Sequence, residues 1–270
     1  MARIALGIAY DGSPWRGWQR QPHGQTIQNE VETAASRFLN QATRVSAAGR
    51  TDAGVHAISQ VAHIDTNVER RPESWIRALN SYLPPQIAVQ WACEVSQNFH
   101  AQFSAQSRTY VYVVRNARVR SPLSHQHTGW VFQPLQLKPM QQAAKHFLGE
   151  HDFSSFRSSD CQASSPTRLI FKADIEQYHN HFYFIFTANG FLHHMVRNMV
   201  GALIAVGQEK QQADWIIDLL QKKDRRLSAA TFSPNGLYLA EINYPEHFNI
   251  PTTPWRQSLA SLVGMGLQSG

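Results

Sequence analysis

The stretch Gly49-Arg-Thr-Asp-Ala-Gly-Val-His56 brings one carboxylate and one guanidinium together between two glycines. Such glycines suit a loop that a ligand can approach closely. In extended chain, Arg50 and Asp52 face the same side, so their side chains can pair. A guanidinium beside a carboxylate favours its ionised form, which makes Asp52 a candidate nucleophile. The alternative is an Asx-turn in which Asp52 caps its own loop.

A second cationic side chain, Arg197, lies in the segment Phe191-Leu-His-His-Met-Val-Arg-Asn-Met-Val-Gly201. At helical spacing, His194, Arg197 and Asn198 share one narrow stripe, and most of the remaining helix surface is apolar. A helix of that kind is largely buried, and a buried arginine needs an anionic partner. Asp52 and a phosphate group are both candidates. The alternative is a basic stripe on the protein surface.

One aromatic side chain is a candidate for binding a base. Tyr110 lies in Arg108-Thr-Tyr-Val-Tyr-Val-Val, where it shares a strand face with Tyr112. An aromatic ring that faces a cleft can stack on a base that has left its helix. The alternative is that Tyr110 belongs to the core, where most strand aromatics lie.

The charge balance favours a polyanionic partner. The chain has 270 residues, 25 Lys and Arg against 19 Asp and Glu, a formal charge of +6 and a sequence pI of about 9.5. Basic and aromatic residues alternate near the start, which suits phosphate and base contacts. These residues are Trp15, Arg16, Trp18 and Arg20. The tryptophans could equally pack inward, and the run Lys222 to Arg226 is a solvated face or a further RNA contact.

Several classes of site lack a signature. Cys93 and Cys161 cannot form a disulfide framework or a thiolate zinc site, and a reducing, cytoplasmic location fits them. The histidine pairs have poor chelating geometry and no His-Glu-x-x-His occurs, so no metal is expected. These pairs are His125 with His127, His179 with His181, and His193 with His194. No nucleotide-binding glycine motif, signal peptide or membrane-spanning run is expected either.

The elements that must position these residues alternate between strand and helix patterns. Strands are predicted at residues 4–10, 45–48, 60–65, 87–95, 108–114, 169–177, 182–188 and 237–242. Helices are predicted at 26–39, 72–83, 137–148, 191–206 and 216–221, and a long loop at 115–135. The order predicts two similar α+β halves, 1–105 and 106–247, followed by a tail, 248–270, with little signal.

The chain resembles the TruA family of tRNA pseudouridine synthases along nearly its whole length. The matching segments include the octapeptide Gly49 to His56, Tyr10-Asp-Gly with Gly17-Trp-Gln-Arg20, and Phe191 to Asn198. Further matches are Phe99-His-Ala-Gln-Phe-Ser-Ala105, Arg108-Thr-Tyr110, Gly149-Glu-His-Asp-Phe153 and Gly236-Leu-Tyr-Leu239. The octapeptide is the most specific of them.

The resemblance implies a pseudouridine synthase fold, a mixed and mostly antiparallel sheet flanked by helices with a central basic cleft. It implies that Asp52 is the nucleophile, that Arg50 helps to extrude the target nucleotide, and that Tyr110 stacks on the uracil. Arg197 would pair with Asp52, while Arg16, Arg20, His194 and Asn198 are candidate substrate contacts. The implied protein is a cofactor-free homodimer that modifies uridines 38–40 of the tRNA anticodon stem-loop.

The reaction breaks the N1–C1′ bond of uridine and rejoins the rotated base through C5. Asp52 could attack the sugar, attack the base, or remove the 2′ proton to give a glycal. Two other functions compete with this one. A non-catalytic tRNA-binding protein would explain the charge but not the lone aspartate, and a glycoside hydrolase normally needs two carboxylates. Glu30, Asp152 or Asp174 could supply the second.

Overall fold

A computed structural model describes residues 1–22 and 24–263. The chain forms two compact units. The first comprises Met1–Gln106 with Tyr238–Ser258, and the second comprises Ser107–Leu237 with the chain from Leu259 onward. Each contains strands and helices, which confirms the predicted α+β class.

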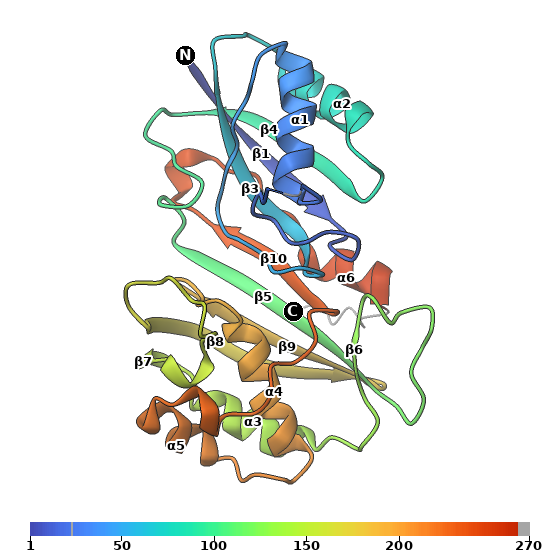
Figure 1. The fold of residues 1–270 in the computed structure, drawn as a ribbon, viewed down its shortest axis with the longest axis vertical. Helices are drawn as coiled ribbons and strands as arrows, with labels where there is room; N and C mark the ends of the chain where they lie inside the picture. Colours follow the sequence, from blue (N-terminus) through green and yellow to red (C-terminus); the bar gives the residue numbers. More distant parts are fainter. Residues whose placement is uncertain (23, 264–270) are drawn as a thin grey trace. The chain divides into compact units, whose positions relative to one another are not determined.

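The strands of the first unit run in the order β4, β1, β3, β10 (Figure 1). They are β1 (Ala2–Tyr10), β3 (His56–Thr66), β4 (Ile87–Val95) and β10 (Leu237–Asn243), and β2 (Ser46–Ala47) pairs with β3. The pairs of β1 with β3 and β4 are antiparallel, whereas β10 runs parallel to β3. This unit is therefore mixed and mostly antiparallel, as predicted.

Two helices belong to the first unit, α1 (Ile27–Leu39) and α2 (Pro72–Tyr82), and they lie next to each other in Figure 1. The Thr26 side chain caps α1 by accepting from the Asn29 N–H, the role expected of a threonine before a helix. The buried residues of α1 recur at helical spacing. They are Ile27, Gln28, Val31, Glu32, Ala34, Ala35 and Leu39. The helix therefore buries a polar pair, Gln28 and Glu32, along with its apolar stripe.

The second unit has its own strands, in the order β5, β9, β8, β7. They are β5 (Ser107–Asn116), β7 (Gly149–Asp152), β8 (Thr167–Tyr178) and β9 (His181–Ala188), all paired antiparallel. The short β6 (Gly129–Val131) runs parallel to β5. The helices are α3 (Leu137–Lys145), α4 (Met195–Gly207) and α5 (Trp215–Lys222), which lie together in Figure 1.

Several features differ from the sequence predictions, among them the unpredicted strand β7. The helix expected from residue 191 begins only at Met195, because His194 has a left-handed backbone (φ 63°) that a helix cannot continue through. β6 lies inside the stretch expected to be a loop, and α6 (Trp255–Val263) lies in the tail. The end of that tail, 264–270, falls outside the described residues. The last strand, expected in the second half, pairs with β3 of the first unit.

The predicted division of the chain into two halves, with a boundary after residue 105, stays a prediction. In the compact units, the chain returns to the first unit at Tyr238, which pairs with His56.

No helix among the described residues is long and apolar enough to cross a lipid bilayer.

A buried histidine in the first unit makes stability depend on pH. His63 is 5% exposed and its Nδ1 accepts the Ala101 N–H at 3.2 Å. Burial, and then the charge of Arg3, lower the pKa of His63 to about 4. An unfolded histidine titrates near 6.5, so between these values only the unfolded state binds the proton. We therefore expect stability to fall as pH decreases from about 6.5 towards 4, by on the order of 2 kcal/mol.

His63→Asn checks this expectation, because the asparagine oxygen can replace the Nδ1 acceptor without titrating. Urea unfolding of both proteins between pH 7.5 and 5 should show a smaller loss of stability in the variant. Equal losses would assign the pH dependence to other groups.

Candidate functional site

The octapeptide forms a loop whose backbone is held at both ends. The Ala48 N–H donates to the Val61 carbonyl at 2.8 Å, and the Gln60 side chain donates to the Gly49 carbonyl at 2.9 Å. At the far end, the Val55 N–H donates to the Asp52 carbonyl at 3.1 Å, and Gly54 has φ 78°. A left-handed residue is needed there to turn the chain into β3, which explains this glycine.

A second loop lies between Asp11 and Gln25, and its described residues, 11–22 and 24–25, pack against the first. The Trp18 N–H donates to the Thr51 carbonyl at 3.0 Å, and the Gly54 N–H donates to the Trp15 carbonyl at 3.2 Å. The Tyr10 and Thr51 hydroxyls lie 2.8 Å apart. Trp18 is only 1% exposed, so its indole fills the space under this contact. The two loops therefore form one rigid frame around Asp52.

Asp52 is half-buried and Arg50 is exposed. The hydrogen bonds of Thr51 and of the Asp52 carbonyl hold the backbone on which the Asp52 carboxylate stands. A side chain on a fixed backbone, partly open to solvent, has the access and the rigidity that a nucleophile requires.

A second carboxylate lies in the same unit. Asp11 is within 3.1 Å of the His56 Nδ1 and accepts from the Ser13 N–H at 2.9 Å. The hydrogen bond with His56 holds the pKa of Asp11 well below its usual range. His56 is 2% exposed, and its ring stacks on Tyr238 with centroids 4.8 Å apart. Neither Asp11 nor His56 was predicted to have a role, although both belong to motifs that carry the family resemblance.

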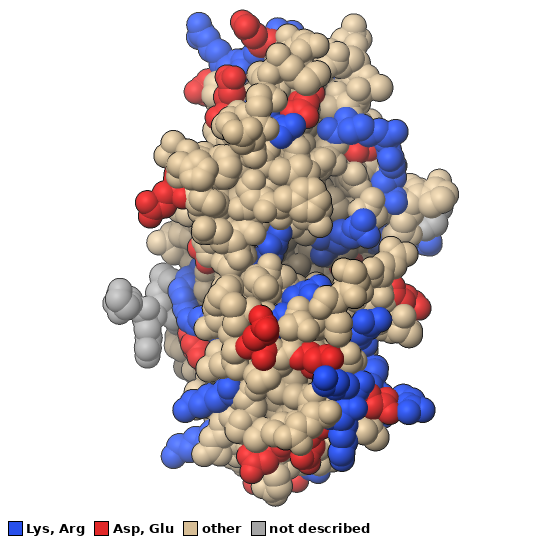
Figure 2. Space-filling view, turned by 90° about the vertical axis from the view of Figure 1, so that its left-hand side faces the viewer, with Lys and Arg blue, Asp and Glu red and all other residues tan. Residues whose placement is uncertain are grey.

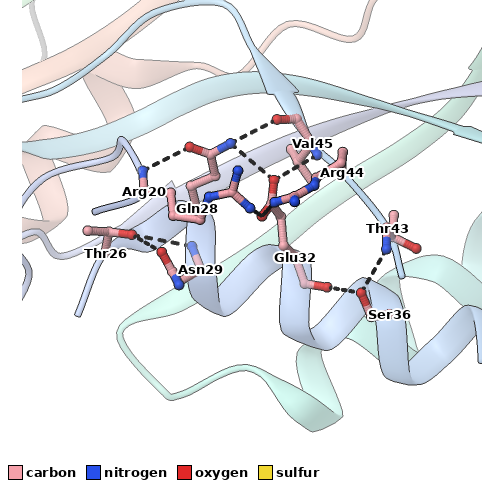
Figure 3. A network of polar contacts seen from close by, with 9 residues as sticks. All are labelled: Arg20, Thr26, Gln28, Asn29, Glu32, Ser36, Thr43, Arg44 and Val45. Carbon is pink, nitrogen blue, oxygen red and sulfur yellow. Dashed lines mark hydrogen bonds and ion pairs between the residues drawn. The ribbon is translucent and has the colours of Figure 1, made fainter. Parts of the chain in front are cut away.

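Buried polar side chains on α1 tie the same two loops to the helix (Figure 3). One Glu32 oxygen accepts the Val45 N–H and the Gln28 amide, both at 3.1 Å. The other accepts from Arg20 at 3.2 Å and from Arg44 at 3.5 Å. Gln28 accepts the Arg20 N–H at 3.0 Å and donates to the Val45 carbonyl at 3.2 Å. One carboxylate thus fixes the segment that leads into the octapeptide and the loop that packs on it.

Glu32→Gln is expected to destabilise the protein by about 1–3 kcal/mol, because it removes the negative acceptor from charged and buried donors. The urea unfolding midpoint measures this effect, with an unchanged slope showing that the unfolded state is unaffected. The matched control is Arg44→Gln, whose side chain is 72% exposed and makes the longest contact. That variant should lose less than about 1 kcal/mol. Equal losses in the two variants would contradict the role given to the carboxylate.

The basic candidates near the start lie on the surface, while their neighbour Trp18 does not. Arg16 and Arg20 are exposed, and Arg20 forms the ion pair with Glu32. On the face drawn in Figure 2, Lys and Arg side chains alternate with Asp and Glu side chains. The basic excess of the chain is therefore not spread as a single patch over that face.

The other candidates belong to the second unit. Tyr110 on β5 is 8% exposed, with its ring edge-on to Phe191 at 5.2 Å. His194 precedes α4 and is half-buried. Arg197 is half-buried as well, and its Nε donates to the Phe232 carbonyl at 2.8 Å. This hydrogen bond helps to orient the guanidinium.

Asn198 is fully buried and its amide joins three segments. It donates to the Phe156 carbonyl at 2.7 Å and accepts from Thr231 at 2.7 Å and Arg225 at 3.0 Å. Its expected substrate contact stays a prediction, and the geometry gives it a bracing role. Arg225 comes from the basic run 222–226, in which Lys223 also pairs with Asp152 at 3.3 Å. Two side chains of this basic run therefore contact other residues of the second unit.

The structure thus places the candidates in two groups. Asp52, Arg50, Arg16 and Arg20 lie in the first unit, and Tyr110, His194, Arg197 and Asn198 lie in the second.

The chain is similar to known proteins along most of its length. A family profile described as tRNA pseudouridine synthase matches residues 8–104 and 143–245. The tRNA pseudouridine synthase A of Bordetella avium is 52% identical over 261 residues, covering 96% of this chain and 98% of that protein. That of Bordetella parapertussis is 55% identical, covering 92% and 93%, and that of Burkholderia mallei is 46% identical, covering 98% and 99%.

A crystal structure of a Cbf5-Nop10-Gar1 complex aligns with 74% of this chain and 45% of its own chain, at 13% identity and a TM-score of 0.35. That similarity is too distant to carry over any property.

Proposed function

Since the chain belongs to the tRNA pseudouridine synthase family, an isomerase family that acts on tRNA, we propose that it converts uridines 38–40 of the anticodon stem-loop to pseudouridine with Asp52 as nucleophile. Family membership favours this enzyme over a non-catalytic tRNA-binding protein or a glycoside hydrolase. The observation that carries the proposal is the rigid frame around Asp52, in which loop 11–25 and the start of β3 hold the backbone of a half-buried carboxylate.

The remaining roles follow the chemistry of each side chain. Arg50 is exposed and suits a phosphate or a displaced nucleotide. Tyr110 exposes only a small part of its ring, which suits stacking on a single uracil. Arg197 would supply positive charge to Asp52, while its Nε donates to the Phe232 carbonyl. The pairing of Arg197 with Asp52 stays a prediction from sequence resemblance.

The mechanism requires the detached uracil to remain bound while it rotates. Removing a base from a stack costs a few kcal/mol, and aromatic stacking contributes roughly 1–3 kcal/mol per base. Tyr110 therefore offsets much of the cost of extrusion. Contacts with phosphates would supply most of the remaining affinity, and binding should weaken steeply with salt. A homodimer remains part of the proposal.

The test is release of tritium from tRNA labelled at C5 of uridine, because bond formation at C5 displaces that hydrogen. Wild-type protein should release tritium and leave pseudouridine at positions 38–40. Release of free uracil would instead indicate a hydrolase. Binding of tRNA without tritium release would indicate a non-catalytic protein.

A further inference from the structure

The second unit contains a pocket that none of the proposed catalytic roles uses. Its volume is about 260 Å³, and it lies where β6 runs beside β5 (Figure 1). Its lining includes two guanidinium groups, an imidazole, three hydroxyl groups, one amide and one indole. The residues that bring them are Arg115, Arg120, Ser121, His125, Thr128, Trp130, Ser233 and Asn235, with Gly129 completing the wall. The size suits one phosphate with its sugar rather than a whole cofactor.

The pocket is organised by hydrogen bonds within its own unit. Arg115 donates to the Val119 carbonyl at 2.6 Å, which shapes the loop after β5. The Trp130 Nε1 donates to the Ala117 carbonyl at 2.8 Å, which fixes the plane of the indole. Asn235 donates to the His125 carbonyl at 3.0 Å and joins the far wall to the same loop. A site whose walls are fixed in advance loses little entropy when a ligand binds.

Two glycines at the pocket, Gly129 in its lining and Gly236 beside it, lie too close to neighbouring atoms to carry a side chain. A Cβ on Gly129 would lie 2.7 Å from the ring of Phe232 and from the Tyr112 hydroxyl. Gly236 has φ 113°, and a Cβ there would lie 2.6 Å from the Gly129 nitrogen. The backbone segments that contain Gly129 and Gly236 therefore approach each other too closely for a side chain at either position.

The residues that line the pocket include two arginines and no Asp or Glu. Between Ser107 and Gly149 the chain contains no Asp or Glu, yet it carries Arg115 near the end of β5 and Arg118 and Arg120 in the loop that follows. Arginine guanidinium groups recognise phosphate oxygens through paired N–H donors. The Trp130 side chain is 42% exposed beside them and offers a surface on which a base can stack. The combination of guanidinium, hydroxyl and indole groups matches a nucleotide within a nucleic acid.

We propose that this pocket binds a backbone phosphate of the tRNA substrate, with the neighbouring base against Trp130. The inference rests on the proposed function, and it adds an RNA contact through residues other than those assigned to the target uridine. A second copy of the chain is the other occupant that the test must distinguish from tRNA. The same loop carries exposed apolar side chains, such as Leu123, which is 95% exposed. A contact between two copies of the chain therefore has to be tested against tRNA binding.

The test compares Arg120→Gln with Arg118→Gln, since both arginines are exposed and lie in the same loop, but only Arg120 lines the pocket. The dissociation constant for full-length tRNA is measured at several salt concentrations. Arg120→Gln should weaken binding by roughly 3–10-fold at low salt and reduce the slope of log K against log salt by about one. Arg118→Gln should change neither quantity.

Trp130→Ala provides a second, independent measurement. Stacking involves no counterion release, so this variant should weaken binding about fivefold or more with an unchanged salt slope. Trp130→Phe should recover most of that loss, which a simple folding defect would not allow. Tritium release by each variant at saturating tRNA keeps the two proposals separate, since an inactive wild-type protein would contradict the proposed function itself.

Three results would overturn the pocket proposal while leaving the enzyme intact. One is equal tRNA binding by Arg120→Gln and Arg118→Gln. Another is a change of sedimentation coefficient in Arg120→Gln or Trp130→Ala, which would make this surface a contact between copies. The third is competition by millimolar inorganic phosphate or uridine monophosphate that acts equally on wild type and Arg120→Gln. Repeating the measurements with the isolated anticodon stem-loop shows whether the bound phosphate lies in that arm.

Discussion

Asp52→Asn is expected to abolish pseudouridine formation while leaving tRNA binding nearly unchanged. Asparagine has the size of aspartate but carries no charge and cannot act as a nucleophile or a base. The backbone around position 52 is held by the Thr51 carbonyl and the Asp52 carbonyl, neither of which the substitution removes. Loss of a nucleophile costs several orders of magnitude in kcat, on the order of 10⁴–10⁶ in well-studied hydrolases. Tritium release measures this directly.

Asp11 is the control for this prediction, because it is the other carboxylate of the same motif-bearing region. The hydrogen bond between Asp11 and His56 keeps the pKa of Asp11 well below its usual range, so Asp11 is also a candidate anion and has to be tested beside Asp52. Its contacts with Ser13 and His56 indicate a structural role instead. Asp11→Asn should therefore lower stability and retain measurable turnover. Turnover by Asp52→Asn together with an inactive Asp11→Asn would move the nucleophile to Asp11.

The elements that could be predicted from sequence are those with local signals. The helix from Thr26 has a capping residue and a regular apolar stripe, and its observed bounds agree with the prediction. The strand at 87–95 agrees residue for residue, and Pro72 marks the start of α2 as its fixed φ angle requires. The octapeptide was predicted to be a loop because of its two glycines, and of these Gly54 adopts the left-handed backbone (φ 78°) that favours glycine.

The features that could not be predicted depend on contacts between distant segments. Nothing local shows that the strand from Leu237 pairs with β3, since parallel pairing leaves no mark in either sequence. The left-handed backbone of His194 ends a helical pattern that its side chain would otherwise extend. β6 is only three residues long and exists through its pairing with β5.

The hydrogen bonds and ion pairs of Glu32 also could not be predicted from the sequence, because they join segments that are distant along the chain. Glu32 is 8% exposed, although a glutamate in an amphipathic helix is ordinarily placed on the solvent face. Its burial is compensated by donors from residues 20, 28, 44 and 45, which are brought together only by folding. The sequence therefore predicted the Asp52 loop but not the helix side chain that fixes its approach.

Gly17→Ala is expected to reduce activity about 10–100-fold by moving the Asp52 loop. Gly17 has φ 88°, and a Cβ there would lie 2.6 Å from the Thr51 carbonyl oxygen and 3.1 Å from the Asp52 carbonyl carbon. Both neighbours are backbone atoms held by other hydrogen bonds, so the loops must separate. A displacement near 1 Å is enough to cost about 10²-fold in a positioned reaction. Steady-state tritium release gives the activity, and urea unfolding gives the stability.

Gly24→Ala separates the steric effect from the backbone effect. Gly24 lies in the same loop with φ 71°, and a Cβ there would meet no atom within 4 Å. Both variants therefore force alanine into a left-handed conformation, at a cost of about 1 kcal/mol each. Only Gly17→Ala adds a collision with the Asp52 loop, so only that variant should lose kcat. Because the difference between the variants removes the shared backbone cost, equal kcat values would show that the contact between these loops does not position the nucleophile.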